Sequence, residues 1–125
     1  MSSIVRAYTP LRDPDLFREA CYVDGRWQSD AQSSLVVDDP ATGEPIGSVP
    51  KAGRTETRVA IEAADRALVT WRALLAKERA RLLRRWYELI MANQEDLATI
   101  MTLEQGKPLA ESRGEVAYGA SFIEW

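Results

Sequence analysis

Few side chains in this sequence are of the types that catalyse reactions. The 125 residues contain no histidine and one cysteine, Cys21. A Ser-His-Asp triad, a Cys-His pair, a histidine-ligated metal, a cysteine-based zinc site and an internal disulfide are therefore impossible within the chain. An activated thiol needs a positive neighbour or a helix N-terminus, but Cys21 lies in a β-prone run beside Tyr22 and Val23. We interpret Cys21 as a half-buried structural residue, and we predict no catalytic and no metal-binding residue.

The charged clusters favour solvated helix faces over binding sites. Lys77, Arg81 and Arg85 align at helical spacing, as a phosphate or nucleic-acid site would require. Glu78 and Glu88 are mixed into this basic run, however, and the net charge of the chain is −3. Nucleic-acid-binding proteins usually carry a basic surplus, so we expect no nucleic-acid partner.

Two further patterns are also explained more simply without chemistry. Glu111 and Glu115 lie four residues apart, which would suit paired acid and base groups, but Arg113 lies between them. An exposed helix face is the simpler interpretation. The glycines form no GxGxxG motif and no Walker A motif, so we predict no cofactor-binding residue in the chain. The chemical types and spacing of these residues therefore indicate no particular catalysed reaction.

Proline and glycine divide the chain into the parts that must position these residues. Five of the six prolines lie in the first 50 residues, whereas residues 54–105 contain neither proline nor glycine. This distribution of proline and glycine predicts turns and strands in the first part of the chain and helices in the second. We expect an N-terminal arm over residues 1–19, a β-hairpin segment over 20–53 and a helical segment over 54–125.

The β segment is predicted to form two short hairpins. Asp24 and Gly25 separate two β-prone runs, and Asp-Gly is a strong signal for a type I′ turn, which needs positive φ at both central residues. Isolated hairpins are marginal in water, so both need another element to pack on. The expected strands are 21–23, 26–28, 35–38 and 46–49.

The first two of four expected helices are amphipathic. We place the N-cap of the first at Thr55, with Glu56 in its first turn, and the start of the second near Lys77. Three of the four tryptophans lie on apolar helical faces, which favours core packing over a stacking platform. On the second helix, the residues expected to be buried are Leu82, Leu83, Trp86, Leu89 and Ile90.

The last two helices are set by capping signals. Asn93 and Asp96 resemble a capping box for a third helix, and Gly106 is its expected stop. Pro108 is the expected first residue of a fourth helix, which reaches Trp125 without a stop signal. Native domains seldom end on an aromatic residue in mid-helix, so we expect a longer parent protein.

Several segments resemble the aldehyde dehydrogenase superfamily. They are residues 22–27 (YVDGRW) with 39–50 (DPATGEPIGSVP), and residues 101–111 (MTLEQGKPLAE) with 121–125 (SFIEW). Together they resemble its succinate-semialdehyde dehydrogenase branch and the glutarate-semialdehyde relatives. The resemblance implies an α+β segment, with two short β-hairpins followed by about four α-helices. This segment would be the N-terminal part of the α/β aldehyde dehydrogenase fold, within an incomplete cofactor-binding domain.

The resemblance also implies a parent activity, the oxidation of succinate semialdehyde to succinate with NADP⁺ or NAD⁺. In the family, the glycine-rich cofactor segments, the nucleophilic cysteine, the general-base glutamate and the oxyanion-holding asparagine follow the region that this chain resembles. None of them corresponds to a residue here, so we expect the chain alone to be inactive and to bind no cofactor. The alternative is a stand-alone helical scaffold or binding module without catalysis.

The expected partners and location follow from the same resemblance and from composition. The partners are the rest of the parent chain and a small aldehyde, with the parent a homo-oligomer. No stretch of about 18 apolar residues is present, and the first residues form no apolar signal segment. We therefore expect no membrane partner and a cytoplasmic location.

Four residues of the last helix are candidates for the wall of a substrate tunnel. They recur at steps of three and four residues and so share one face. Small residues leave clearance on such a wall, and a tyrosine hydroxyl can orient a ligand. In aldehyde dehydrogenases the corresponding helix borders the substrate tunnel, whereas the alternative is ordinary packing against a neighbouring helix. The candidates are Gly114, Tyr118, Ser121 and Trp125.

Overall fold

Within the residues that the structure describes, two hairpins are followed by four α-helices, which confirms the expected architecture. The computed structural model describes residues 11–29 and 33–125. Predictions for residues 1–10 of the N-terminal arm, and for residues 30–32, lie outside the described residues. In chain order the elements are η1 (Pro14–Leu16), β1 (Cys21–Val23), β2 (Arg26–Gln28), β3 (Ser34–Asp38), β4 (Pro45–Pro50), α2 (Arg54–Ala73), α3 (Ala76–Ala92), α4 (Gln94–Gln105) and α5 (Leu109–Glu124).

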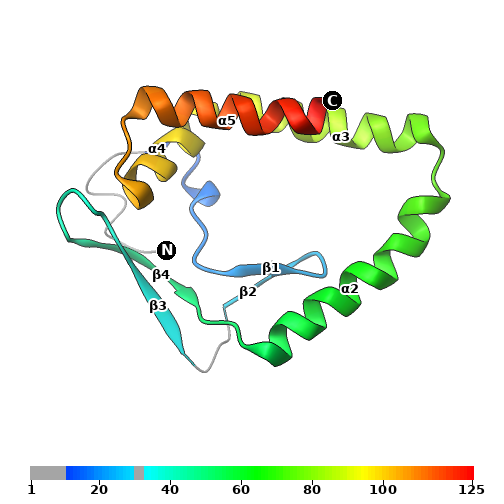
Figure 1. The fold of residues 1–125 in the computed structure, drawn as a ribbon, viewed down its shortest axis with the longest axis horizontal. Helices are drawn as coiled ribbons and strands as arrows, with labels where there is room; N and C mark the ends of the chain where they lie inside the picture. Colours follow the sequence, from blue (N-terminus) through cyan, green and yellow to red (C-terminus); the bar gives the residue numbers. More distant parts are fainter. Residues whose placement is uncertain (1–10, 30–32) are drawn as a thin grey trace.

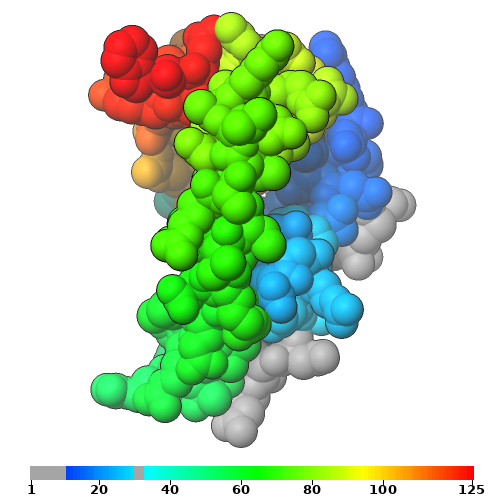
Figure 2. Space-filling view, turned by 90° about the vertical axis from the view of Figure 1, so that its right-hand side faces the viewer, coloured from blue at the N-terminus to red at the C-terminus, as the bar shows by residue number. Residues whose placement is uncertain are grey.

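The elements form an open frame (Figure 1). Helices α3 and α5 run antiparallel and side by side along one edge, and α4 lies against both near one end of this pair. Helix α2 forms a second edge and the β3–β4 hairpin a third, with β1–β2 between them. Viewed from the side of α2, this helix lies along the surface with the first hairpin beside it (Figure 2).

The first hairpin has the turn that its sequence predicts. Asp24 and Gly25 both have positive φ, +52° and +75°, as a type I′ turn requires. Strand β1 pairs with β2 and β3 pairs with β4, both antiparallel, with one irregularity at the Val37–Asp38 step of β3. Cys21, in β1, is half-buried, in agreement with the structural interpretation.

Helix α2 begins two residues earlier than Thr55 would place it. Gly53 is the N-cap, so the Thr55 prediction is wrong, although Glu56 does lie in the first turn. The reason is local hydrogen bonding, because the Gly53 amide donates to the Glu56 carboxylate at 2.8 Å and the Thr57 hydroxyl donates to the Gly53 carbonyl at 2.8 Å. At the start of α5 the difference is one residue, since Pro108 is the N-cap rather than the first helical residue.

The capping box predicted at Asn93 and Asp96 is also wrong. The Asn93 residue ends α3 as well as beginning α4, and both its amide and its side chain donate to the Leu89 carbonyl. That amide is therefore not available to a side chain of α4. The Asp96 carboxylate, whose residue is only 6% exposed, accepts instead from the backbone amides of Arg12 at 3.1 Å and Asp13 at 2.9 Å.

The core is small, and the helices leave much apolar surface uncovered. Ser112 and Ala98 are fully buried where α4 meets α5, and the Thr102 and Ser112 hydroxyls share a 2.8 Å hydrogen bond. The predicted burial of the α3 stripe is wrong, since Leu82 and Trp86 are 49% and 56% exposed. Core packing of the tryptophans is wrong as well, because three of the four are exposed: Trp27, Trp86 and Trp125.

Replacing Gly106 by alanine is expected to lower the free energy of unfolding by about 1–2 kcal/mol. Gly106 has φ +75°, and a Cβ there would lie 2.7 Å from the Pro40 ring, so both the backbone and the neighbour oppose a side chain. Urea unfolding of the whole encoded protein, followed by helical circular dichroism, measures this change. The matched control is Gly114→Ala, where a Cβ meets nothing within 4 Å. This control should stabilise by about 0.5–1 kcal/mol, and an equal loss in both variants would contradict the prediction.

Candidate functional site

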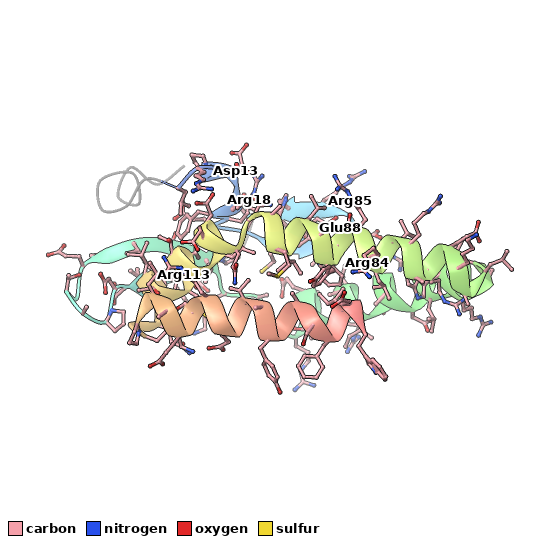
Figure 3. The ribbon with its side chains drawn as sticks, turned by 90° about the horizontal axis from the view of Figure 1, so that it is seen from above. Asp13, Arg18, Arg84, Arg85, Glu88 and Arg113 are labelled. Carbon is pink, nitrogen blue, oxygen red and sulfur yellow. The ribbon has the colours of Figure 1, made fainter. Side chains whose placement is uncertain are left out.

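The tunnel candidates lie together on the outer face of α5. Gly114, Tyr118, Ser121 and Trp125 are all exposed. The opposite side of the helix carries the buried residues of α5. Seen from above, side chains project from α5 on the side turned away from α3, and no other described element lies beyond them (Figure 3). The four residues therefore do not pack against a neighbouring helix within the described structure, and their tunnel role stays a prediction.

An aromatic pair gives this outer face its shape. The rings of Tyr118 and Phe122 meet edge to face, with centroids 4.9 Å apart and planes at 83°. The Ser121 hydroxyl donates to the Tyr118 carbonyl at 2.7 Å, so it is turned back along the helix. Phe122 was not among the predicted tunnel residues, although its spacing of four residues from Tyr118 predicts that the two rings lie close together on the helix. A face that combines exposed aromatic and small residues is suited to contact a ligand whose surface is apolar or partly polar.

The other side of α5 borders an open apolar groove of about 610 Å³. Ile90 of α3, Ile100 of α4 and Val116 of α5 are among the residues that line it. Glu104 and Glu115 lie among the lining residues, and Glu115 forms an ion pair with Lys107. Although Glu104 is exposed, partial loss of water beside the apolar wall raises the pKa of its carboxyl.

Two exposed ion pairs link α5 to its neighbours, and Figure 3 labels their arginines, Arg84 and Arg113. Near its start, Arg113 binds the Glu95 carboxylate of α4 through Nε and Nη2 at 2.8–3.0 Å, and this hydrogen bonding lowers the pKa of Glu95. At its end, Glu124 accepts from Arg84 of α3 at 2.6 Å. Exposed pairs contribute little to stability, so the packing of α5 on α3 and α4, rather than these pairs, sets the orientation of the outer face.

The described residues offer no cradle for a dinucleotide. Both sheets over 11–29 and 33–125 are two-stranded and antiparallel, and no glycine-rich turn there joins a parallel strand to a helix N-terminus. In the same part of the chain, no three histidine, cysteine or acidic side chains gather as metal ligands would. Nor does any described helix combine the length and apolar character needed to cross a bilayer.

A sequence profile of the aldehyde dehydrogenase family matches residues 27–125. The chain belongs to this family. Glutarate-semialdehyde dehydrogenase of Pseudomonas aeruginosa is 63% identical over 116 residues, and the NADP⁺-dependent succinate-semialdehyde dehydrogenase of Escherichia coli is 57% identical over 117 residues. Each alignment covers 92% of this chain but only 24% of the relative. The chain thus spans about a quarter of the length of these aldehyde dehydrogenases, and the resemblance seen in its motifs is confirmed.

Solved structures of aldehyde dehydrogenases share the fold. Succinate-semialdehyde dehydrogenase from Burkholderia pseudomallei superimposes with a TM-score of 0.89 at 56% identity, over 94% of this chain and 24% of that one. A more distant relative, the NADP-dependent glyceraldehyde-3-phosphate dehydrogenase of Bacillus halodurans, has a TM-score of 0.80 at 27% identity over 86% of this chain and 23% of its own, and its structure is a complex with NADP. The fold of the described residues is that of the N-terminal part of aldehyde dehydrogenases.

Proposed function

We propose that this chain is the N-terminal part of an NAD(P)⁺-dependent aldehyde dehydrogenase that oxidises succinate semialdehyde to succinate. The observation that carries the proposal is 57–63% identity, over nearly the whole chain, to enzymes named for succinate and glutarate semialdehyde. Both compounds are short aldehydes with a carboxylate at the far end, so this is the proposed substrate class, with glutarate semialdehyde as the second candidate. A homo-oligomeric parent in the cytoplasm belongs to the same proposal.

The contribution of these residues to the reaction is structural. The described sheets are two-stranded and antiparallel, which supports the proposal that the nicotinamide cofactor binds outside this segment of the enzyme. The single cysteine of the segment is in a hairpin strand rather than at a helix N-terminus. Within the complete enzyme, α5 would place its outer face along the path of the aldehyde, and its packing on α3 and α4 would hold that face in position.

The chain of residues 1–125 alone is expected to reduce no NADP⁺ or NAD⁺ in the presence of succinate semialdehyde. The reason is chemical, because residues 11–29 and 33–125 form no dinucleotide cradle and place Cys21 in a hairpin strand rather than at a helix N-terminus. The absorbance of the reduced nicotinamide measures this, with the whole encoded protein as the positive control. Turnover by residues 1–125 would refute the inactivity of the segment, and a whole protein inactive on both semialdehydes would refute the substrate class.

Sequencing the gene beyond the Trp125 codon separates the two hypotheses for the protein. A reading frame that continues into a cofactor-binding domain would support the dehydrogenase and exclude the stand-alone binding module. A stop codon at that point in several independent isolates would favour the module, whose helices α3, α4 and α5 contact one another without further elements.

A further inference from the structure

A buried carboxylate in α4 joins two distant parts of the chain. Asp96 lies in the first turn of α4 and is 6% exposed. Its two oxygens accept from the backbone amides of Arg12 and Asp13, which precede it by 84 and 83 residues. Hydrogen bonds to a charged acceptor are stronger than those between neutral groups, and a helix N-terminus also favours a negative charge. The carboxylate is therefore held by two backbone amides that its own helix does not supply.

Residues 11–19, which we call the strap, continue from this point to the second hairpin. Asp13 caps the short η1 turn by accepting from the Asp15 amide at 3.0 Å. At the far end of the strap, the Glu19 carboxylate accepts from the Ser48 amide of β4 at 2.8 Å. Phe17 and Glu19 also approach Gly47 so closely that a Cβ there would lie 3.0 Å from both. The strap thus connects the start of α4 to the middle of β4.

The same hairpin also touches the other end of α4. The ring of Pro40, in the turn between β3 and β4, lies against Gly106 at the C-terminus of the helix. The hairpin is therefore held at both ends of α4, directly at Gly106 and through the strap at Asp96. The Gly106 contact is a packing contact, whereas the Asp96 contact depends on one carboxylate and two amides.

We propose that Asp96 is a latch that positions the β3–β4 hairpin against the helices by holding the strap. When the hydrogen bonds from Arg12 and Asp13 to Asp96 break, the strap separates from α4. The Glu19–Ser48 hydrogen bond at the other end of the strap then weakens, while the helices and the β3–β4 pairing stay intact. Asp96 acts through the strap and is a positioning residue. This inference does not depend on the proposed activity, because it rests only on contacts among the described residues.

Hydrogen exchange at single amides, measured in the whole encoded protein, tests the latch. In Asp96→Asn one carboxylate oxygen becomes an amide NH₂, which cannot accept the second backbone hydrogen bond. Exchange at Arg12, Asp13 and Ser48 is expected to become roughly tenfold faster. The Asp24–Gly25 turn, which does not touch the strap contacts, should be unaffected. The matched control is Asp65→Asn, an exposed acid of α2, which should change none of these amides.

Two further variants distinguish an effect that passes from Asp96 through the strap to Ser48 from a general loss of structure. Glu19→Ala should speed exchange at Ser48 while leaving Arg12 and Asp13 protected, because it opens only the far end. Deletion of residues 1–13 removes both donors but keeps Asp96, and it should again expose Ser48 with the helical circular dichroism retained. The latch is overturned if Ser48 stays protected in the deletion variant. It is equally overturned if Asp96→Asn exposes Arg12 and Asp13 but not Ser48.

Discussion

Gly114→Leu is expected to raise the KM of the proposed complete dehydrogenase for glutarate semialdehyde by about tenfold or more, and its KM for succinate semialdehyde by less. A Cβ at Gly114 meets nothing within 4 Å, so leucine fits the described structure and extends outward along the candidate face. If a tunnel runs there, the new side chain narrows it and the longer aldehyde suffers more. Steady-state kinetics on both aldehydes measure this selectivity, and Gly114→Ala is the control that keeps clearance.

Tyr118→Ala extends the same test to the aromatic part of the face. Tyr118 is 66% exposed, so its loss should change the melting temperature only modestly. Loss of the tyrosine ring and hydroxyl should raise KM by different amounts for the shorter and the longer aldehyde. Equal losses for both aldehydes, together with a large fall in melting temperature in either variant, would instead assign these residues to packing.

The chain of residues 1–125 alone is expected to bind an apolar fluorescent dye strongly and to melt without a cooperative transition. Phe122 of α5 is 61% exposed and Trp125, the C-cap of that helix, is fully exposed. On α3, the side chains of Leu82, Trp86 and Leu89 are about half exposed. Exposed apolar patches beyond a few hundred Å² usually indicate a missing partner. Dye fluorescence, light scattering and calorimetry on the purified chain measure this.

A paired variant makes the dye experiment specific to the outer face of α5. Phe122→Ser with Trp125→Ser should lower the dye signal, whereas Thr70→Ser, a conservative change on exposed α2, should leave it unchanged. A monodisperse monomer that melts cooperatively and binds no dye would show that these surfaces need no further partner.

Local signals in the sequence predicted the turns and the order of elements well. Asp24-Gly25 and Gly106 demand positive φ, and few other residues satisfy that demand, so a short stretch decides the conformation. The hairpins and the helix boundaries followed from such signals to within two residues. Membership of the family followed from motifs that span most of the chain.

Contacts between distant residues could not be predicted in the same way. Asp96 has the right type and spacing for a capping box, but its partners are amides more than 80 residues earlier, which no local pattern indicates. Apolar periodicity on α3 correctly predicted an amphipathic helix, but periodicity does not say whether the covering element lies within these residues. For the candidate site, spacing correctly placed Gly114 and Tyr118 on one exposed face, but no described element covers that face and its function stays a prediction.

Asn93 makes the junction of α3 and α4 intolerant of any change in length. It is both the C-cap of α3 and the N-cap of α4, so no further linker residue separates the two helices. An inserted residue that joins α4 would rotate the residues after it by about 100° around the α4 axis and shift them along it by about 1.5 Å. The outer face of α5 would then point elsewhere and the Arg84–Glu124 pair would be lost. Loop insertions are usually tolerated, but here a single codon would redirect a whole helical layer.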